Sequence, residues 1–279
     1  MHATDRTAQR WRELFLDVMS SLPDVPILLS GGTDSAAILS AALALGRTPD
    51  CYTYSIGGVA GTDLRVAQLM CDTFELQLHV IDLPRDHESL VRDIREIVAR
   101  LGTTRKAAVQ CAHPMWYMAR AIAHAGFDAT YCGTGGVIED NRTGGIILNT
   151  QGEEAFREYR RKNLTPGYTQ DGNGTWAMHT AAQWSGVALL EPLVMEPFAT
   201  YSLSLDAREI NRPVQKGIAM RAFPEFWSRG RWRRTNSPMQ VNSGLRDWHA
   251  TLLDDPAINR RGRKSMAHLY ADITSEDDQ

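Results

Sequence analysis

The residues best suited to chemistry form one short run, Ser30-Gly31-Gly32-Thr33-Asp34-Ser35. The run follows an apolar segment at 25–29 and precedes a helix expected over residues 35–45. Glycines let the backbone approach a phosphate, and a helix N-terminus adds free N–H groups and a positive dipole. Asp34 suits such a place as a ligand of Mg²⁺. The run therefore predicts a phosphate site, although it lacks the lysine of the Walker pattern, and a plain glycine turn with an Asp or Ser cap is the alternative.

Strands and helices must alternate around this run. We expect strands at 25–29, 51–56, 76–81 and 127–132, and helices at 5–22, 35–45, 63–73, 86–101 and 113–125. Such alternation predicts a parallel sheet with helices on both faces, whose ligands bind at the carboxyl ends of the strands. The glycine turns at 31–32, 57–58 and 133–136 all follow strands. They are therefore expected to converge at one edge of the sheet.

The alternation of expected strands and helices ends at about residue 150. A charged helix is expected at 153–162, followed by a stretch at 164–175 rich in Gly, Pro, Thr and Asn. That stretch is either a mobile lid over the site or a plain surface loop. The remainder is mainly helical. We therefore expect a nucleotide-binding part at 1–150 and a mostly helical part at 151–279 that completes the site within one integrated domain.

Composition excludes several classes of protein. The chain has 279 residues, 43% of them hydrophobic, and a net charge of −3, which is ordinary for a globular protein and does not demand a polyanionic partner. Four cysteines without Cys-x-x-Cys spacing and eight histidines without H-E-x-x-H spacing argue against zinc. Without a long apolar run or a secretory signal, we expect a cytoplasmic protein that does not enter a membrane. Basic clusters at 229–234 and 260–264 keep nucleic acid open as a partner, although a solvated surface is their commoner role.

Five stretches, taken in order, resemble one known family. Residues 28–35 resemble the S-G-G-x-D-S loop of the PP-loop ATP pyrophosphatases, and the nearest branch is the synthetase domain of asparagine synthetase, shared by β-lactam synthetases and lasso-peptide cyclases. Residues 53–57, with Asp63 downstream, are similar to the segment of that branch that lies against adenosine. Residues 110–120 resemble its Pro-Met helix, 132–136 its S-G-E-G-[AS]-D-E turn, and 216–223 its K-x-x-L-R-x-A-F helix. The likeness spans roughly residues 20–245.

The resemblance implies a fold, a reaction and a set of site residues. The fold would be α/β, a Rossmann-like parallel sheet of about five strands of the adenine nucleotide alpha hydrolase kind, followed by a mostly helical part. The cofactors would be ATP and Mg²⁺. A substrate carboxylate would be adenylated with release of pyrophosphate, and ammonia or an amine would then displace AMP to leave an amide. Lys216 and Asp34 would be catalytic, and the nucleotide would contact Leu28, Leu29, Ser30, Gly31, Gly32, Thr33, Asp34, Ser35, Tyr54, Ser55, Cys132 and Gly133.

Three departures from the family pattern matter. Val137-Ile138 precede Glu139-Asp140, so a two-residue insertion would restore this acidic pair as Mg²⁺ ligands beside Asp34; otherwise both are surface carboxylates. Cys132 replaces a common serine, and we interpret it as structural. We expect no glutaminase domain, because position 2 is not cysteine and few residues precede the loop at 30–35, so the nitrogen is expected from outside this chain, from free ammonia, an amine or a partner that supplies it.

Two other functions remain open. A PP-loop enzyme could adenylate a nucleobase in a nucleic acid, and the basic clusters favour that reading slightly. A protein that binds nucleotide without catalysis is the third hypothesis, against which the intact loop and Lys216 count.

Overall fold

The computed structural model describes residues 5–134, 142–163, 173–230, 232, 239–262 and 265–275. Its first half contains α1 (Arg6–Ser20), β1 (Ile27–Leu28), α2 (Thr33–Ala44), β2 (Cys51–Ile56), α3 (Thr62–Phe74), β3 (Leu78–Leu83), α4 (His87–Leu101), α5 (Lys106–His124) and β4 (Ala129–Tyr131). The second half contains α6 (Arg142–Gln151), α7 (Glu153–Asn163), α8 (Gly174–Gln183), β5 (Ala188–Leu190), η1 (Pro192–Val194), α9 (Phe198–Ser204), α10 (Ala207–Ile210), α11 (Gly217–Ala222), α12 (Pro224–Trp227), α13 (Met239–Asn242), α14 (Leu245–Asp254) and α15 (Met266–Ser275).

The five strands form one parallel sheet in the order β3-β2-β1-β4-β5. The expected α/β fold with a sheet of about five strands is therefore confirmed. The fifth strand comes from residues 188–190, inside the part that we expected to be mostly helical, and no strand was assigned there. Three residues are too few to show a strand period, so its pairing with β4 decides its conformation.

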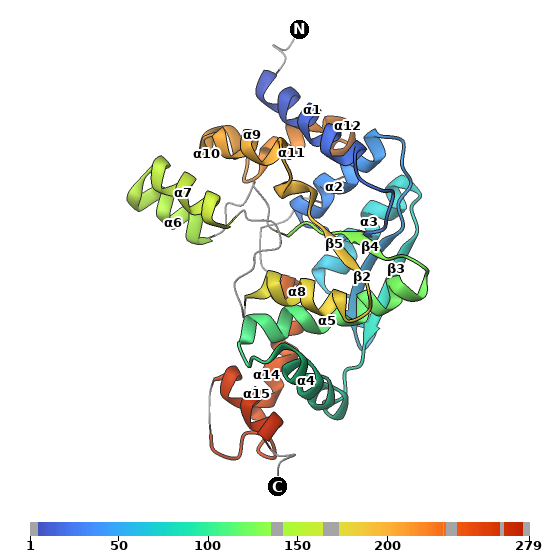
Figure 1. Cartoon of the computed structure of the whole chain (residues 1–279), viewed down its shortest axis with the longest axis vertical. Helices are drawn as coiled ribbons and strands as arrows, with labels where there is room; N and C mark the ends of the chain where they lie inside the picture. Colours follow the sequence, from blue (N-terminus) through green and yellow to red (C-terminus); the bar gives the residue numbers. More distant parts are fainter. Residues whose placement is uncertain are drawn as a thin grey trace.

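Helices cover both faces of the sheet and bury a separate core on each (Figure 1). Alternation along each strand divides its residues between the faces. Ile27, Leu29 and Tyr131 join the core that α1, α2, α3, α9 and α11 cover. Leu28, Tyr52 and Leu189 join the core that α4, α5, α8, α14 and α15 cover. Residues from the second half of the chain thus complete both cores.

One helix boundary inferred from the sequence is wrong. We expected a helix over residues 113–125 that begins at a Pro-Met pair, but α5 begins at Lys106 and Pro114 lies inside it. Proline removes one helical hydrogen bond, which usually marks a boundary. Here burial of Ala108, Val109 and Ala112 on the preceding turns holds the helix together through the proline.

A buried polar network attaches the C-terminal helices to α4 and α5. His113 Nε2 lies 3.2 Å from Asp93 Oδ2, and His113 Nδ1 lies 3.1 Å from His249 Nε2. His249 Nδ1 lies 2.7 Å from the hydroxyl of Tyr270, and Tyr117 donates to Asp93 at 2.6 Å. Burial and the nearby His113 hold the pKa of His249 well below its usual value. The network therefore fixes α14 through the neutral imidazole of His249 and α15 through the hydroxyl of Tyr270.

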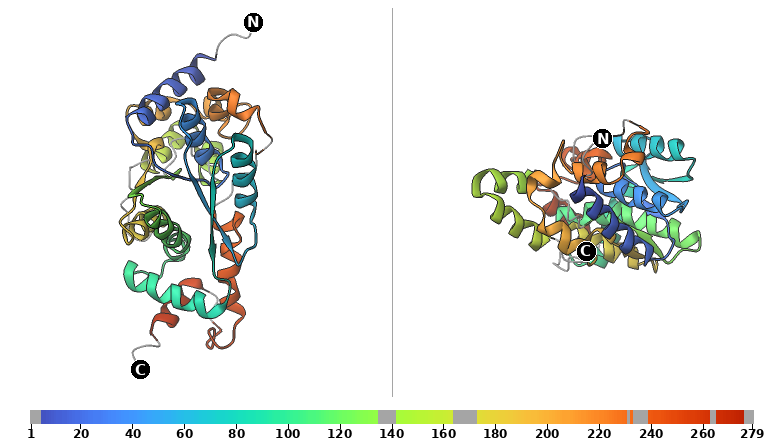
Figure 2. Two further views of the ribbon diagram at one scale, coloured as in Figure 1. Left: turned by 90° about the vertical axis from the view of Figure 1, so that its right-hand side faces the viewer. Right: turned by 90° about the horizontal axis from the view of Figure 1, so that it is seen from above.

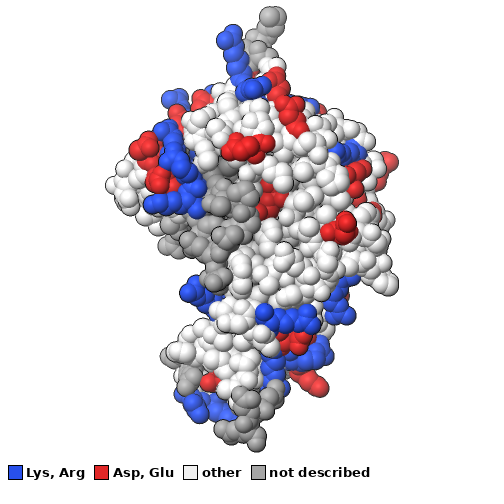
Figure 3. Space-filling view, viewed as in Figure 1, with Lys and Arg blue, Asp and Glu red and all other residues white. Residues whose placement is uncertain are grey.

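The helices α6 and α7 extend to one side of the sheet (Figures 1 and 2). On the face shown in Figure 3, basic and acidic side chains are interspersed. Arg157 pairs with Glu154, and Arg161 with Glu158, so the charges on α7 largely pair within the helix. Among the described residues, no helix is long and apolar enough to cross a membrane.

Candidate functional site

The loop between β1 and α2 is held by short internal hydrogen bonds. The backbone N–H of Ser30 donates to Ser35 Oγ at 3.3 Å, and Ser35 Oγ donates to the carbonyl of Gly32 at 3.1 Å. Gly31 has a φ of +67°, and a Cβ there would lie 2.6 Å from Val66 Cβ on α3. Only glycine fits that place, so the loop is fixed in shape and packed against α3.

The N-terminus of α2 lies at this loop and carries no side-chain cap among the described residues. Gly32 is its N-cap, and Thr33 and Asp34 follow in the first turn, partly exposed. First-turn N–H groups have no partner within a helix, so such an end binds anions well. Leu28 and Leu29, which directly precede the loop, are buried in the cores on opposite faces of the sheet and so fix the start of the loop.

Lys216 reaches this loop from the far end of the sequence. Its Nζ donates to Asp34 Oδ2 at 2.6 Å, across a separation of 182 residues. The lysine side chain is 5% exposed and that of Asp34 is 23% exposed. A buried ammonium that pairs with a carboxylate is uncommon for lysine, which is usually solvated. The structure therefore brings together the two residues that the resemblance suggested as catalytic.

Local geometry explains how Lys216 is aimed at the loop. The resemblance suggested a helical lysine, but Lys216 is the N-cap of α11 and has a left-handed φ of +55°. Its N–H donates to Asn211 Oδ1 at 2.9 Å. A Cβ on Gly217 would lie 2.2 Å from the carbonyl oxygen of Arg212, so the chain closes tightly there only with glycine. A left-handed non-glycine residue costs about 1 kcal/mol or more, and such strain gathers at functional sites.

Arg221 braces the same segment from α11. It donates to the carbonyl of Arg212 at 2.9 Å and to the carbonyl of Glu209 at 2.6 Å. Its Nε also donates to Asp5 Oδ2 at 2.8 Å. Asp5 in turn caps α1, where its Oδ1 accepts from Ala8 N–H at 3.1 Å. The start of α1 and the segment that carries Lys216 are thus fixed to each other.

The turn after β4 lies against the loop between β1 and α2. A Cβ on Gly133 would lie 2.9 Å from the backbone N of Ser35 and 3.2 Å from Asp34 Cβ, so glycine permits this close approach. Cys132 is buried, and burial raises the pKa of its thiol to about 11. A protonated, enclosed thiol is a poor nucleophile. Its Sγ lies 3.2 Å from Thr134 Oγ1, a structural contact.

Two suggested nucleotide contacts on β2 have side chains with other partners. The hydroxyl of Tyr54 donates to Ser243 Oγ at 2.7 Å, and Ser55 Oγ donates to Asp82 Oδ1 at 2.6 Å. Each hydroxyl proton is therefore already used within the protein, so a nucleotide would meet these residues through their backbone, the tyrosine ring or a hydroxyl oxygen that accepts.

One atom fits a metal ion. Asp34 Oδ1 is buried and has no hydrogen-bond partner within the described residues, while Oδ2 faces Lys216. A buried carboxylate oxygen without a donor suits a hard cation. Glu139 and Asp140, the suggested further ligands, lie outside the described residues, as do Gly135, Gly136 and most of the expected lid at 164–175. In the described part of the chain, no group of three His, Cys, Asp or Glu residues could hold a metal ion.

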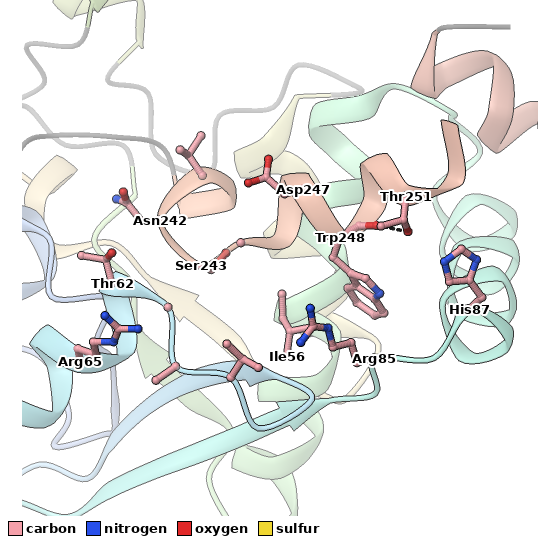
Figure 4. A pocket seen from close by; sticks show the side chains of 15 residues that line it. Ile56, Thr62, Arg65, Arg85, His87, Asn242, Ser243, Asp247, Trp248 and Thr251 are labelled. Carbon is pink, nitrogen blue, oxygen red and sulfur yellow. Dashed lines mark hydrogen bonds between the residues drawn. The ribbon is translucent and has the colours of Figure 1, made fainter. Parts of the chain in front are cut away.

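A pocket of about 580 Å³ opens beside the carboxyl end of β2 (Figure 4). Ile56 and Trp248 provide apolar wall, and Arg65, Arg85 and Asp247 provide charge. Arg85 extends toward Ile56, while Arg65 comes from α3 on the other side. Sequence reasoning missed this pocket because its walls come from three separated segments, 56–65, 85–87 and 241–251.

The basic clusters of the sequence are described only in part. Of the clusters at 229–234 and 260–264, residues 231, 233, 234, 263 and 264 lie outside the described residues. Outside these two clusters, Arg157 pairs with Glu154 and Arg161 pairs with Glu158.

Comparison with known protein families assigns this chain to one of them. The family model described as asparagine synthase matches residues 16–268. No match was found among curated proteins. The matched range includes the loop at 30–35, the turn at Gly133 and Lys216, which the fold brings to one place. The chain therefore belongs to the asparagine synthase family and is an ATP-dependent, amide-forming ligase of the asparagine synthetase type.

Proposed function

We propose that the chain transfers AMP from ATP to a substrate carboxylate, releases pyrophosphate, and then forms an amide with ammonia or an amine. The observation that carries this proposal is the contact between Lys216 and Asp34 at the uncapped N-terminus of α2. A positive charge, an open helix end and a glycine loop meet where the β- and γ-phosphates of ATP would lie. These are the groups that a departing pyrophosphate needs.

Each group has a distinct part in the first step. The carboxylate attacks the α-phosphorus, and the bond to the β-phosphate oxygen breaks with its electron pair going to pyrophosphate. The N–H groups of the first turn of α2 bind the oxygens that gain charge, and Lys216 neutralises them. Asp34 would hold Mg²⁺ through Oδ1, which would shield the phosphate charge. Because the lysine and the loop are both held rigidly, little reorganisation is needed during the reaction.

The pocket beside β2 is suited to the nucleoside. Ile56, the last residue of β2, directly follows Tyr54 and Ser55 and lines the pocket. Trp248 adds an aromatic wall to the pocket. Backbone groups at this strand end can meet the edge of the base, while the apolar walls bury its faces. The volume of about 580 Å³ also leaves room for part of the carboxylate substrate. We infer that adenosine binds there, with its phosphates directed toward α2.

Exchange of labelled pyrophosphate into ATP tests the proposal. The protein is incubated with ATP, Mg²⁺ and, one at a time, the free amino acids and other small carboxylates. Exchange that requires one of these carboxylates is expected. Exchange that requires RNA or DNA instead would show that a nucleobase is adenylated, and ATP binding without any exchange would contradict the proposed chemistry.

A further inference from the structure

Glu191 is a buried carboxylate beside the proposed reaction centre. It directly follows β5 and is 4% exposed. Thr134 Oγ1 donates to Glu191 Oε1 at 2.5 Å, and His179 Nε2 on α8 lies 3.3 Å from the same oxygen. Carboxylates are seldom buried without a reason, because removal from water costs several kcal/mol unless partners compensate.

The position of Glu191 follows from the pairing of β4 with β5. Cys132 N–H donates to the carbonyl of Leu190 at 2.8 Å, so Glu191 lies alongside the turn that begins at Gly133. Gly133 contacts the backbone of Asp34 and Ser35, and Thr134 is the next residue. The carboxylate of Glu191 therefore contacts the residue that follows Gly133, and Gly133 lies against the loop at 30–35. This place is at the carboxyl edge of the sheet, where ligands bind.

The turn itself lacks an acidic residue among its described positions. In the pattern S-G-E-G that residues 132–135 resemble, Thr134 occupies the place of the glutamate. The hydroxyl of Thr134 instead binds the carboxylate of Glu191, from the adjacent strand. A negative charge is therefore present at this place but comes from a different residue.

We propose that Glu191 binds the incoming ammonia or amine and takes its proton during amide formation, an inference that rests on the proposed function. The neutral amine nitrogen attacks the acyl carbon of the adenylate and forms the C–N bond. The C–O bond to AMP breaks, and its electron pair leaves with the phosphate. The proton lost by nitrogen passes to the carboxylate of Glu191. His179, whose side chain is 20% exposed, then passes it toward solvent.

This role separates the two steps of the reaction. Adenylation does not involve the amine, whereas amide formation needs a base. General base catalysis contributes about 10²–10⁴-fold to a rate. Glu191→Gln keeps an oxygen that can accept from Thr134 but cannot take a proton. Exchange of pyrophosphate should therefore stay within about threefold of the wild-type rate, while kcat for amide formation from ammonium chloride falls by about 10²–10⁴-fold.

The experiment measures both steps on purified full-length protein, with the carboxylate that supports exchange. Hydroxylamine, which is largely unprotonated at neutral pH, should still trap the adenylate as a hydroxamate in Glu191→Gln. Because the fraction of free ammonia rises with pH for both proteins alike, the two amide-forming rates are compared at one pH. Glu191→Gln with normal amide formation, or with both steps lost in a folded protein, would overturn the inference.

A second variant guards against misfolding. Thr134→Glu combined with Glu191→Gln returns the carboxylate to the turn, so amide formation should recover at least about tenfold over Glu191→Gln, within the range of a general base. If Glu191→Gln does not fold, the double variant decides the question: recovered amide formation supports the role, and exchange without amide formation overturns it for Glu191. If the wild type shows no carboxylate-dependent exchange, the proposed function itself fails, and this inference fails with it.

Discussion

Replacing Lys216 with methionine should lower the rate of catalysis by two to three orders of magnitude while the fold survives. Methionine matches the length of the lysine stem but carries no charge. At the observed 2.6 Å, the attraction between Nζ and Asp34 Oδ2 is about 6 kcal/mol gross at an effective dielectric constant of 20. Desolvation of the ammonium offsets most of it, because the lysine side chain is only 5% exposed.

The two consequences of this change differ in size. Asp34 is 23% exposed, so water can partly solvate the carboxylate left behind, and we expect unfolding free energy to fall by about 1–3 kcal/mol. Loss of a charge that stabilises the departing pyrophosphate should cost about 3–4 kcal/mol in the transition state, a 10²–10³-fold lower rate of pyrophosphate exchange. Denaturant melts and the exchange assay measure the two effects separately.

A matched control is Lys162→Met on α7, where the side chain is 74% exposed. It should leave both quantities unchanged. Full exchange activity in folded Lys216→Met would refute the role of the lysine. A loss of activity no larger than the unfolded fraction would show that Lys216 acts only on stability.

Backbone geometry gives a further test at the same position. Because Lys216 has a φ of +55°, alanine keeps the left-handed strain and glycine removes it. Lys216→Gly should therefore be more stable than Lys216→Ala by about 1 kcal/mol, with both inactive. Equal stability would show that the segment relaxes when the ion pair is lost.

Three other outcomes follow from the structure. Gly31→Ala should abolish exchange because its Cβ would meet Val66, whereas Gly46→Ala, with a φ of +76° and open space, should lose only about 1 kcal/mol of stability in a melt and keep its activity. Asp34→Asn should raise the Mg²⁺ concentration for half-maximal exchange by roughly tenfold or more, as measured by titration with Mg²⁺. Burial holds the pKa of His249 in the folded protein below its unfolded value of about 6.5, so the unfolded chain binds more protons. The free energy of unfolding should therefore fall as pH drops below about 6.5, by up to about 1.4 kcal/mol per pH unit. Denaturant melts of His249→Gln should show a weaker dependence of stability on pH.

The loop at 30–35 could be located from the sequence because its residues are contiguous and both flanking elements have clear patterns; its role in binding phosphate stays a prediction. Lys216 could be connected to it only through the family resemblance, since no local pattern indicates that a residue 182 positions away meets Asp34. Glu191 gave no signal at all: its environment arises from the pairing of a three-residue strand with β4. The start of α5 was misplaced because burial of the residues before Pro114 outweighs the local effect of proline.

The bond between Asp5 and Arg221 also sets an order in time. The two residues are 216 positions apart, so at 5–20 residues per second a ribosome needs about 10–40 s between them. From the synthesis of residue 35 until the end of that interval, the loop at 30–35 has been made, but Lys216 is either not yet made or not yet fixed by Arg221. We expect a nascent chain to complete its reactive site in one late step, when the segment around Lys216 packs against the start of α1. An incompletely synthesised chain should therefore not cleave ATP.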